Sequence, residues 1–238
     1  MIVTEVRPAT LDRQDVATEA GRAWLTDRYA RSEQAYVRLN MITSLTGAAS
    51  GSDGTSDTLT SRTDRIILGV IRAAADVVVV GAQSVRAEGY IVPRSTRLAI
   101  VTASGDLEGH RLTLAEGASP DRVLIVCPES RADAIRADAV SHGVQIVAVP
   151  GDERMSPPAI LAALAERGLR RVVCEGGPSL ASQFAAAGVI DEYCITVAPT
   201  IEPVAQPFLR LDVRPDTDPV GVLVDEAGFS YLRLRARR

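Results

Sequence analysis

The sequence predicts an α/β fold in which a mostly parallel β-sheet is flanked by helices. β-Branched runs such as residues 76–81 (DVVVVG) and Arg171–Cys174 are typical of strands buried on both faces, and stretches with helical spacing separate them. Near the C-terminus, Val220–Val224 and Tyr231–Leu234 predict two strands paired antiparallel across Gly228. We therefore expect a mixed sheet that carries its antiparallel strands late in the chain.

The first 35 residues are polar and predict a loop with one helix around residues 15–28. We expect residues 1–35 to be an N-terminal extension packed on a single domain of residues 36–238, because no linker or repeat interrupts the α/β pattern. Tyr36–Leu45 alternates apolar and polar residues, as a strand with one polar face does. The remaining elements follow the same patterns, with helices at residues 62–75, 131–141, 158–167 and 178–187, and strands at 98–103, 123–127, 144–149 and up to 199.

Residues 46–61 form the longest stretch rich in Gly, Ser, Thr and Asp. Such a composition favours a mobile surface loop, and a loop of this length can fold over a ligand. Ser61, at its end, suits the N-cap of the helix that follows.

Composition limits the class of protein. A chain of 238 residues, 46% of them hydrophobic, can bury a sizeable core, and a net charge of -4 gives no electrostatic footprint for nucleic acid. No apolar run reaches the roughly 18 residues of a membrane span, and the N-terminus lacks the pattern of a signal peptide. We expect a cytoplasmic protein with a small-molecule ligand.

Several chemistries are excluded by what the sequence lacks. All 26 basic residues are arginine, so there is no lysine Schiff base, phosphate-loop lysine or lysine general base. The absence of Gly-x-Gly removes the dinucleotide fingerprint of the Rossmann fold. Three widely spaced cysteines and no His-x-x-x-His pair argue against a disulfide framework and against a metal site.

The strongest local signal for function is the Glu-Gly-Gly turn after Arg171–Cys174. Glu175 lies where a strand delivers its last side chain into a crevice, and Gly176 and Gly177 let the backbone approach a ligand. Pro178 suits the first position of a helix, whose free amides can bind a phosphate. The alternative is an ordinary strand–helix turn that binds nothing.

Polar residues also gather at the ends of two other predicted strands. Open α/β sheets bind ligands at the carboxyl ends of their strands, so we expect these ends to meet at one crevice. Ser84 and Glu88 are four residues apart and share one face of a helical turn, although a helix cap and a solvated carboxylate are the alternatives. The candidates are Asn40, Thr43, Ser44 and Thr46 at the first strand, Gly81, Ser84 and Glu88 at the second, and the flanking arginines Arg72, Arg86, Arg94 and Arg97.

Three motifs in order resemble the pyrimidine reductases of riboflavin biosynthesis, the reductase half of the bifunctional deaminase-reductase. They are YVRLNMITSLTG, DVVVVGAQSVRAEGY and VVCEGGPSLASQFAAAGVIDEYCITVAP, and the resemblance covers roughly residues 36–235. It implies a dihydrofolate-reductase-like fold, commonly dimeric, that binds NADPH without a Rossmann fingerprint. It also implies reduction of a 5-amino-6-ribosylamino pyrimidine phosphate to its ribitylamino form.

The resemblance also assigns residues to the cofactor and to the substrate. It implies NADPH binding by Gly81, Ser84, Glu88, Gly176, Gly177, Ser179 and Leu180, and substrate binding by Asn40, Thr46, Arg72, Glu175 and Arg94. Glu175 is also the catalytic candidate for proton delivery, because it is the carboxylate at a strand end, with bound water as the rival.

The chain departs from the family pattern, and Asn40 stands where many bacterial members have lysine, although archaeal-type members have asparagine. It has Thr46 where the family has aspartate, and Glu88-Gly89-Tyr90 where the family has Asp, then Asn or Asp, then Pro. The zinc deaminase half is absent, since no His-x-Glu with Pro-Cys-x-x-Cys occurs. Two alternatives therefore stay open, namely a dihydrofolate or other pterin-like reductase and a non-catalytic homologue that binds a nucleotide.

Overall fold

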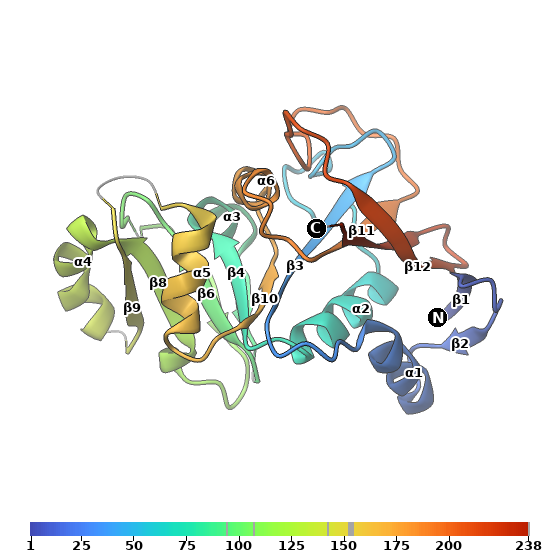
Figure 1. Ribbon diagram of the computed structural model, residues 1–238, viewed down its shortest axis with the longest axis horizontal. Coiled ribbons are helices and arrows are strands. Elements are labelled where there is room, and N and C mark those ends of the chain that lie inside the picture. The colour runs from blue at the N-terminus through green and yellow to red at the C-terminus, as the bar shows by residue number, and fades with distance from the viewer. Residues whose placement is uncertain (94, 107, 142, 152–154, 238) are drawn as a thin grey trace.

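One long sheet forms the backbone of the molecule. The computed structural model describes residues 1–93, 95–106, 108–141, 143–151 and 155–237. Within these residues, eleven strands join in the order β2-β1-β12-β13-β11-β3-β10-β4-β6-β8-β9, and the sheet runs along the long axis of the molecule from β9 to β1 and β2 (Figure 1).

The sheet is mixed, as the sequence predicted, and its larger part is parallel. Neighbouring strands run parallel from β11 to β9, and these strands are β3 (Tyr36–Ser44), β4 (Val77–Gly81), β6 (Arg97–Val101), β8 (Val123–Pro128), β9 (Gln145–Val149), β10 (Arg171–Cys174) and β11 (Glu192–Ala198). The antiparallel part consists of β13 (Ser230–Ala236), β12 (Thr217–Asp225), β1 (Ile2–Arg7) and β2 (Arg13–Asp15).

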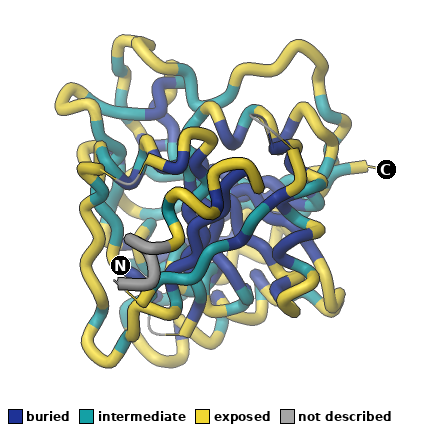
Figure 2. Tube along the Cα trace, turned by 90° about the vertical axis from the view of Figure 1, so that its left-hand side faces the viewer, coloured by how far each residue is buried: buried dark blue, intermediate teal, exposed yellow. Residues whose placement is uncertain are grey.

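Helices cover both faces of this sheet because alternate strand residues point to opposite sides. On β4, Val77 and Val79 pack in one core cluster with residues of α5 and α6, whereas Val78 and Val80 pack in another with α3. Figure 2 shows the buried residues concentrated in the strands beneath exposed loops. The helices are α1 (Glu19–Tyr29), α2 (Arg62–Ala73), α3 (Ala82–Glu88), α4 (Glu129–Ser141), α5 (Pro157–Ala165) and α6 (Pro178–Ala186).

The sequence analysis did not predict four of the strands. Residues 1–35 contain β1 and β2 in addition to the expected helix, and β1 pairs antiparallel with β12. β5 (Tyr90–Val92) and β7 (Leu112–Leu114) form a separate two-stranded parallel sheet. After β7, the short 3₁₀ helix η1 (Pro120–Arg122) leads into β8. Three of these four strands have three residues each, which is too few for an alternating pattern to be recognised in the sequence. Each is a strand because it pairs with a neighbouring strand.

A buried ion cluster joins three central strands of the sheet. Glu192 on β11 accepts from Arg38 Nε on β3 (2.5 Å) and from Arg233 Nη2 on β13 (2.8 Å), and both Glu192 and Arg38 are 0% exposed. Burial alone would raise the pKa of the Glu192 carboxyl, but Arg38 and Arg233 outweigh burial and lower it. The cluster therefore holds a carboxylate in its ionised form inside the core.

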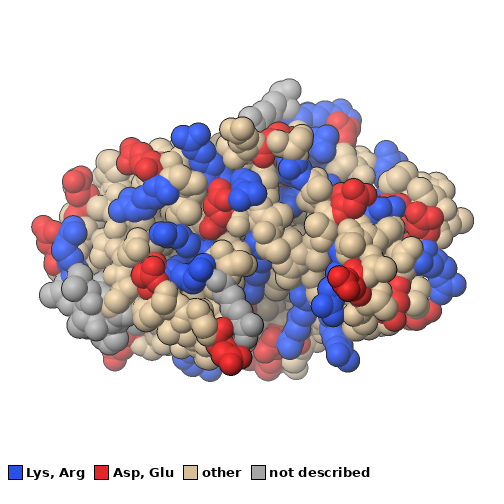
Figure 3. Space-filling view, turned by 90° about the horizontal axis from the view of Figure 1, so that it is seen from below, with Lys and Arg blue, Asp and Glu red and all other residues tan. Residues whose placement is uncertain are grey.

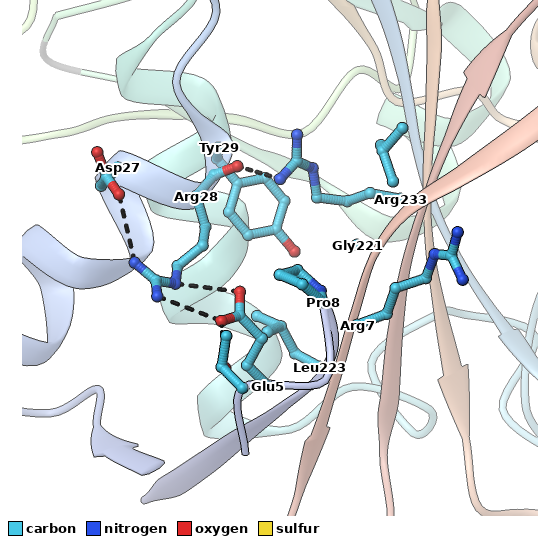
Figure 4. A pocket seen from close by; sticks show the side chains of 11 residues that line it. Glu5, Arg7, Pro8, Asp27, Arg28, Tyr29, Gly221, Leu223 and Arg233 are labelled. Atoms are coloured by element: carbon cyan, nitrogen blue, oxygen red, sulfur yellow. Dashed lines mark hydrogen bonds and ion pairs between the residues drawn. The ribbon is translucent and has the colours of Figure 1, made fainter. Parts of the chain in front are cut away.

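The N-terminal extension packs on the outer, antiparallel part of the sheet. Between α1, β1, β12 and β13 lies a cavity of about 280 Å³, in which Arg28 donates to both carboxylate oxygens of Glu5 (Figure 4). Arg233 donates to the backbone carbonyl of Arg28, so the cavity borders the buried ion cluster. The extension thus shares hydrogen bonds and charge pairs with the sheet that it extends.

The surface carries no concentration of one charge on the face seen in Figure 3, where acidic and basic side chains are interspersed. None of the helices formed by the described residues combines the length and apolarity that crossing a bilayer requires. The three cysteines are buried and free.

Two helical glycines should respond oppositely to the same substitution. A Cβ at Gly21 in α1 would lie 2.0 Å from the backbone carbonyl oxygen of Asp15, whereas a Cβ at Gly69 in α2 would meet nothing within 4 Å. Gly21→Ala should lower the free energy of unfolding by about 1–3 kcal/mol, because the end of β2 must move. Gly69→Ala should raise it by up to about 1 kcal/mol through helix propensity. Urea unfolding of both variants measures this, and equal effects would contradict the close approach of α1 to β2.

Candidate functional site

The carboxyl ends of β3, β10 and β4 meet, as the sequence analysis predicted. Cys174, the last residue of β10, pairs with Leu39 of β3 on one side and with Val79 of β4 on the other. The N–H of Gly81, at the end of β4, donates to the carbonyl oxygen of Gly176 over 2.7 Å. Since β10 ends here while β3 continues to Ser44, a crevice opens above the end of β10.

The diglycine turn brings backbone close to the side chains of Met41 and Ser84. Gly176 has φ +84°, and a Cβ there would lie 2.6 Å from Met41 Sδ. A Cβ at Gly177 would lie 2.4 Å from Ser84 Oγ. The Gly176–Gly177 peptide is cis. The turn therefore presents bare backbone beside the first residues of α3.

The N-terminus of α6 follows directly on the turn. Gly177 is its N-cap and supplies no side-chain cap, and Pro178 takes the first helical position. The first helical bond runs from the Ala181 N–H to the Gly177 carbonyl (3.0 Å), so the amides of Ser179 and Leu180 have no partner inside the helix. Amides of this kind, at the positive end of a helix dipole, bind anions.

A cleft of about 620 Å³ lies over these strand ends. Six of the residues predicted for the site line it, namely Asn40, Arg72, Ser84, Glu88, Glu175 and Gly177. Its other walls come from the 46–61 loop, from α2 and from the β5–β7 sheet, which contribute Ser56, Asp57, Thr60, Asp64, Arg65, Leu68, Tyr90, Ile91, Arg111 and Thr113.

The structure does not bring every predicted residue to the cleft. The Thr46 hydroxyl is turned to the segment after β11, where it donates to the Glu202 carbonyl (2.6 Å) and accepts from the Glu202 N–H (3.1 Å), so Thr46 lies away from the lining. Ser179 is exposed on α6, and Leu180 is buried beneath it. Arg94 lies outside the residues that the structure describes.

Glu175 is the most tightly held carboxylate of the cleft. Its Oε1 accepts from Arg72 Nε (2.7 Å), and its Oε2 accepts from Arg72 Nη2 (2.6 Å) and from the Tyr90 hydroxyl (2.7 Å). The Glu175 side chain is 5% exposed, and that of Arg72 is 23% exposed. The Glu175 carboxylate thus accepts three hydrogen bonds, two from one guanidinium and one from a phenol, and its geometry in the cleft is that of a hydrogen-bond acceptor.

Glu88 connects the 46–61 loop to the end of α3. Ser56 donates to Glu88 through its backbone N–H (3.2 Å) and its hydroxyl (3.1 Å). Partial desolvation raises the pKa of the Glu88 carboxyl, although these two hydrogen bonds act in the opposite direction. The loop that the sequence predicted to cover a ligand therefore contacts a residue on the rim of the cleft.

Sequence reasoning missed several residues that line the cleft. On α2, Asp64, Leu68 and Arg72 are four residues apart and share one face, a spacing that could have revealed the first two once Arg72 was a candidate. Burial raises the pKa of the Asp64 carboxyl, while hydrogen bonds from Thr60 (2.6 Å) and Thr196 (2.7 Å) oppose it. Tyr90 gave no signal beyond its departure from the family pattern.

With this geometry in view, the family is decided by a direct match. A family model described as the RibD C-terminal domain matches residues 35–202. The chain belongs to the RibD C-terminal domain family. The match begins at residue 35, where the N-terminal extension was predicted to end.

Curated relatives of the family share modest identity with this chain. The riboflavin biosynthesis protein RibD of Mycobacterium tuberculosis is 28% identical over 200 residues, which are 83% of this chain and 51% of the relative. RibD of Bacillus amyloliquefaciens is 27% identical over 204 residues, 83% of this chain and 53% of the relative. The chain spans about half the length of the curated relatives that it matches.

A solved structure shares the fold. A pyrimidine reductase-like protein from Corynebacterium diphtheriae superposes with a TM-score of 0.73 at 24% identity, over 86% of this chain and 92% of that one. At this identity the likeness establishes the architecture, a mixed sheet with the strand order described above.

The ion pair between Arg72 and Glu175 should contribute more to the free energy of unfolding than the exposed pair between Arg65 and Asp57. Arg72→Leu should lower the free energy of unfolding by about 3 kcal/mol, because it leaves a nearly buried carboxylate with Tyr90 as its remaining donor. Arg65→Leu, on the same helix, breaks a pair with Asp57 whose side chains are 63% and 75% exposed, and should cost at most about 1 kcal/mol. Equal losses in urea unfolding would show that Glu175 is solvated.

Proposed function

We propose that this protein is an NADPH-dependent reductase that converts the ribosylamino group of a ribosylaminopyrimidine phosphate to the ribitylamino form, a step of riboflavin biosynthesis. Membership of the RibD C-terminal domain family and the names of its relatives support the reaction class. The observation that carries the proposal is the meeting of three strand ends at the diglycine turn, beside the free amides of α6.

The residues present fit a dinucleotide cofactor. The diglycine turn reaches the cleft through Gly177, which lines it, while Gly176 is buried and its carbonyl accepts from the Gly81 N–H. The amides of Ser179 and Leu180 would hold the pyrophosphate at the N-terminus of α6. Ser84, whose hydroxyl lies beside Gly177, would bind a phosphate or ribose oxygen, and Glu88 would accept from ribose hydroxyls. When bound, NADPH supplies the hydride.

The substrate would lie between the turn and α2. Asn40, Arg72 and Glu175 line that part of the cleft, and Glu175 would accept a hydrogen bond from an N–H or O–H group of the substrate. Arg65 and Arg111, which line the outer walls, would bind the substrate phosphate in a chain without lysine. Reduction consumes one hydride and one proton, and bound water would deliver the proton because the Glu175 carboxylate already accepts from Arg72 and Tyr90.

The proposal includes a cytoplasmic homodimer. Apolar side chains are exposed where the end of β3 meets the segment after β11, with Ile201 80% and Leu45 62% exposed. The Leu45 N–H donates to the Thr200 carbonyl (2.9 Å), so the two exposed side chains come from segments joined through their backbones. A surface of this kind is more often covered by a partner than left in water, and a second copy is the partner that the family resemblance implies.

Oxidation of NADPH in the presence of the ribosylaminopyrimidine phosphate, followed by absorbance, tests the reaction. Turnover with this substrate and none with dihydrofolate would support the proposal. Binding of NADPH without turnover on either would favour the non-catalytic alternative.

A proline placed in α6 should separate cofactor binding from folding. In Ser179→Pro the amide that is free at the second helical position is removed, and α5 shows that this chain accepts two prolines at the start of a helix, at Pro157 and Pro158. The variant should keep its unfolding free energy within about 1 kcal/mol, while its Kd for NADPH should rise about 10-fold or more through the lost charge-assisted hydrogen bond. Ser179→Ala keeps the amide and should bind NADPH like the wild type. Unchanged affinity in Ser179→Pro would place the pyrophosphate elsewhere.

A further inference from the structure

The position of Tyr90 is set by the turn at the preceding residue, Gly89. α3 ends at Glu88, and Gly89, at φ +74°, turns the chain into β5. The Tyr90 N–H then donates to the carbonyl oxygen of Arg111 over 2.8 Å, which begins the pairing of β5 with β7. This turn directs the Tyr90 side chain into the cleft, toward the end of β10.

The Tyr90 hydroxyl makes the two oxygens of Glu175 unequal. Oε2 receives two donors, Arg72 Nη2 at 2.6 Å and the Tyr90 hydroxyl at 2.7 Å, whereas Oε1 receives Arg72 Nε at 2.7 Å. The Arg72 guanidinium also lies over the Tyr90 ring, 5.6 Å from its centroid. Oε1 thus keeps the larger share of its acceptor capacity for a group in the cleft.

We propose that Tyr90 is a positioning residue that fixes Glu175 so that its Oε1 is offered to a donor group of the substrate. This inference rests on the proposed function, because it deepens the role of Glu175 in the same cleft. The donor would be an N–H or O–H of the pyrimidine or its amino substituents, since a carboxylate oxygen paired with Arg72 accepts hydrogen bonds and does not donate them.

The hydrogen bond from Tyr90 to Glu175 depends on a residue at which this chain departs from the family pattern. Where the family resemblance places proline, Tyr90 supplies both an N–H, bonded to Arg111, and a hydroxyl, bonded to Glu175, and proline has neither group. Burial and the nearby Glu175 raise the pKa of the Tyr90 phenol well above its ordinary value. The charged groups facing it are Arg72, Glu88 and Glu175, so the phenol stays protonated and remains a donor through neutral pH.

A double-mutant cycle tests whether Tyr90 acts through Glu175. Tyr90→Phe keeps the ring beneath Arg72 and removes the hydroxyl, and should lower kcat/KM for the pyrimidine substrate about 10- to 100-fold, mostly through KM, with the Kd for NADPH unchanged. Once Glu175→Gln is present, adding Tyr90→Phe should change kcat/KM by less than about 2-fold. Tyr36→Phe, whose hydroxyl bonds the Ala74 carbonyl away from the cleft, is the matched control and should behave as wild type.

Two results in the cycle would overturn the inference. One is wild-type kcat/KM in Tyr90→Phe, and the other is a double variant in which the two losses multiply. Absence of turnover in the wild type would count against the proposed function and not against Tyr90. In that case ¹H NMR decides, since the hydroxyl proton bonded to Glu175 should appear downfield, vanish in Tyr90→Phe and move upfield in Glu175→Gln. If the wild-type spectrum holds no such resonance, Tyr90 does not hold Glu175.

Discussion

The hydrogen bond from the Gly81 N–H to the Gly176 carbonyl is the contact on which the site depends. It joins the end of β4 to the turn after β10 over 2.7 Å, and the turn reaches Gly81 with Gly176 in a left-handed conformation (φ +84°) that favours glycine. With the turn held in this way, α6 begins at the crevice and Gly177 lies beside Ser84. A few backbone atoms thus assemble elements that lie about a hundred residues apart in the sequence.

Sequence reasoning succeeded where a pattern repeats within one element. β4 and β10 are β-branched and buried on both faces, and their type and approximate bounds followed from that composition alone. It also placed the strand ends at one crevice, since parallel strands deliver their carboxyl ends to the same edge. It failed for β2, β5 and β7, whose three residues each carry no period and are strands because a neighbour pairs with them.

The same limit explains which site residues were found. Glu175 was predictable from its place after a strand, but its partners were not, because Arg72 and Tyr90 come from elements 103 and 85 residues away. Thr46 was assigned to the substrate by its neighbourhood in sequence, yet its hydroxyl is satisfied by the backbone of Glu202. A side chain's direction follows from the donors and acceptors that surround it in the fold, and these are not local in sequence.

Arginine serves two purposes in this lysine-free chain. Around Glu192, Arg38 and Arg233 are buried and their charges hold three strands together. In the cleft, Arg72 binds both oxygens of Glu175 at a partly exposed position, where the pair can also meet a ligand. Backbone amide NMR during titration with NADPH tests the central claim most directly. The account predicts that the largest shifts occur at Gly81, Gly176, Gly177, Ser179 and Leu180. Shifts confined to the cavity around Glu5 and Tyr29, with the diglycine turn unmoved, would contradict it.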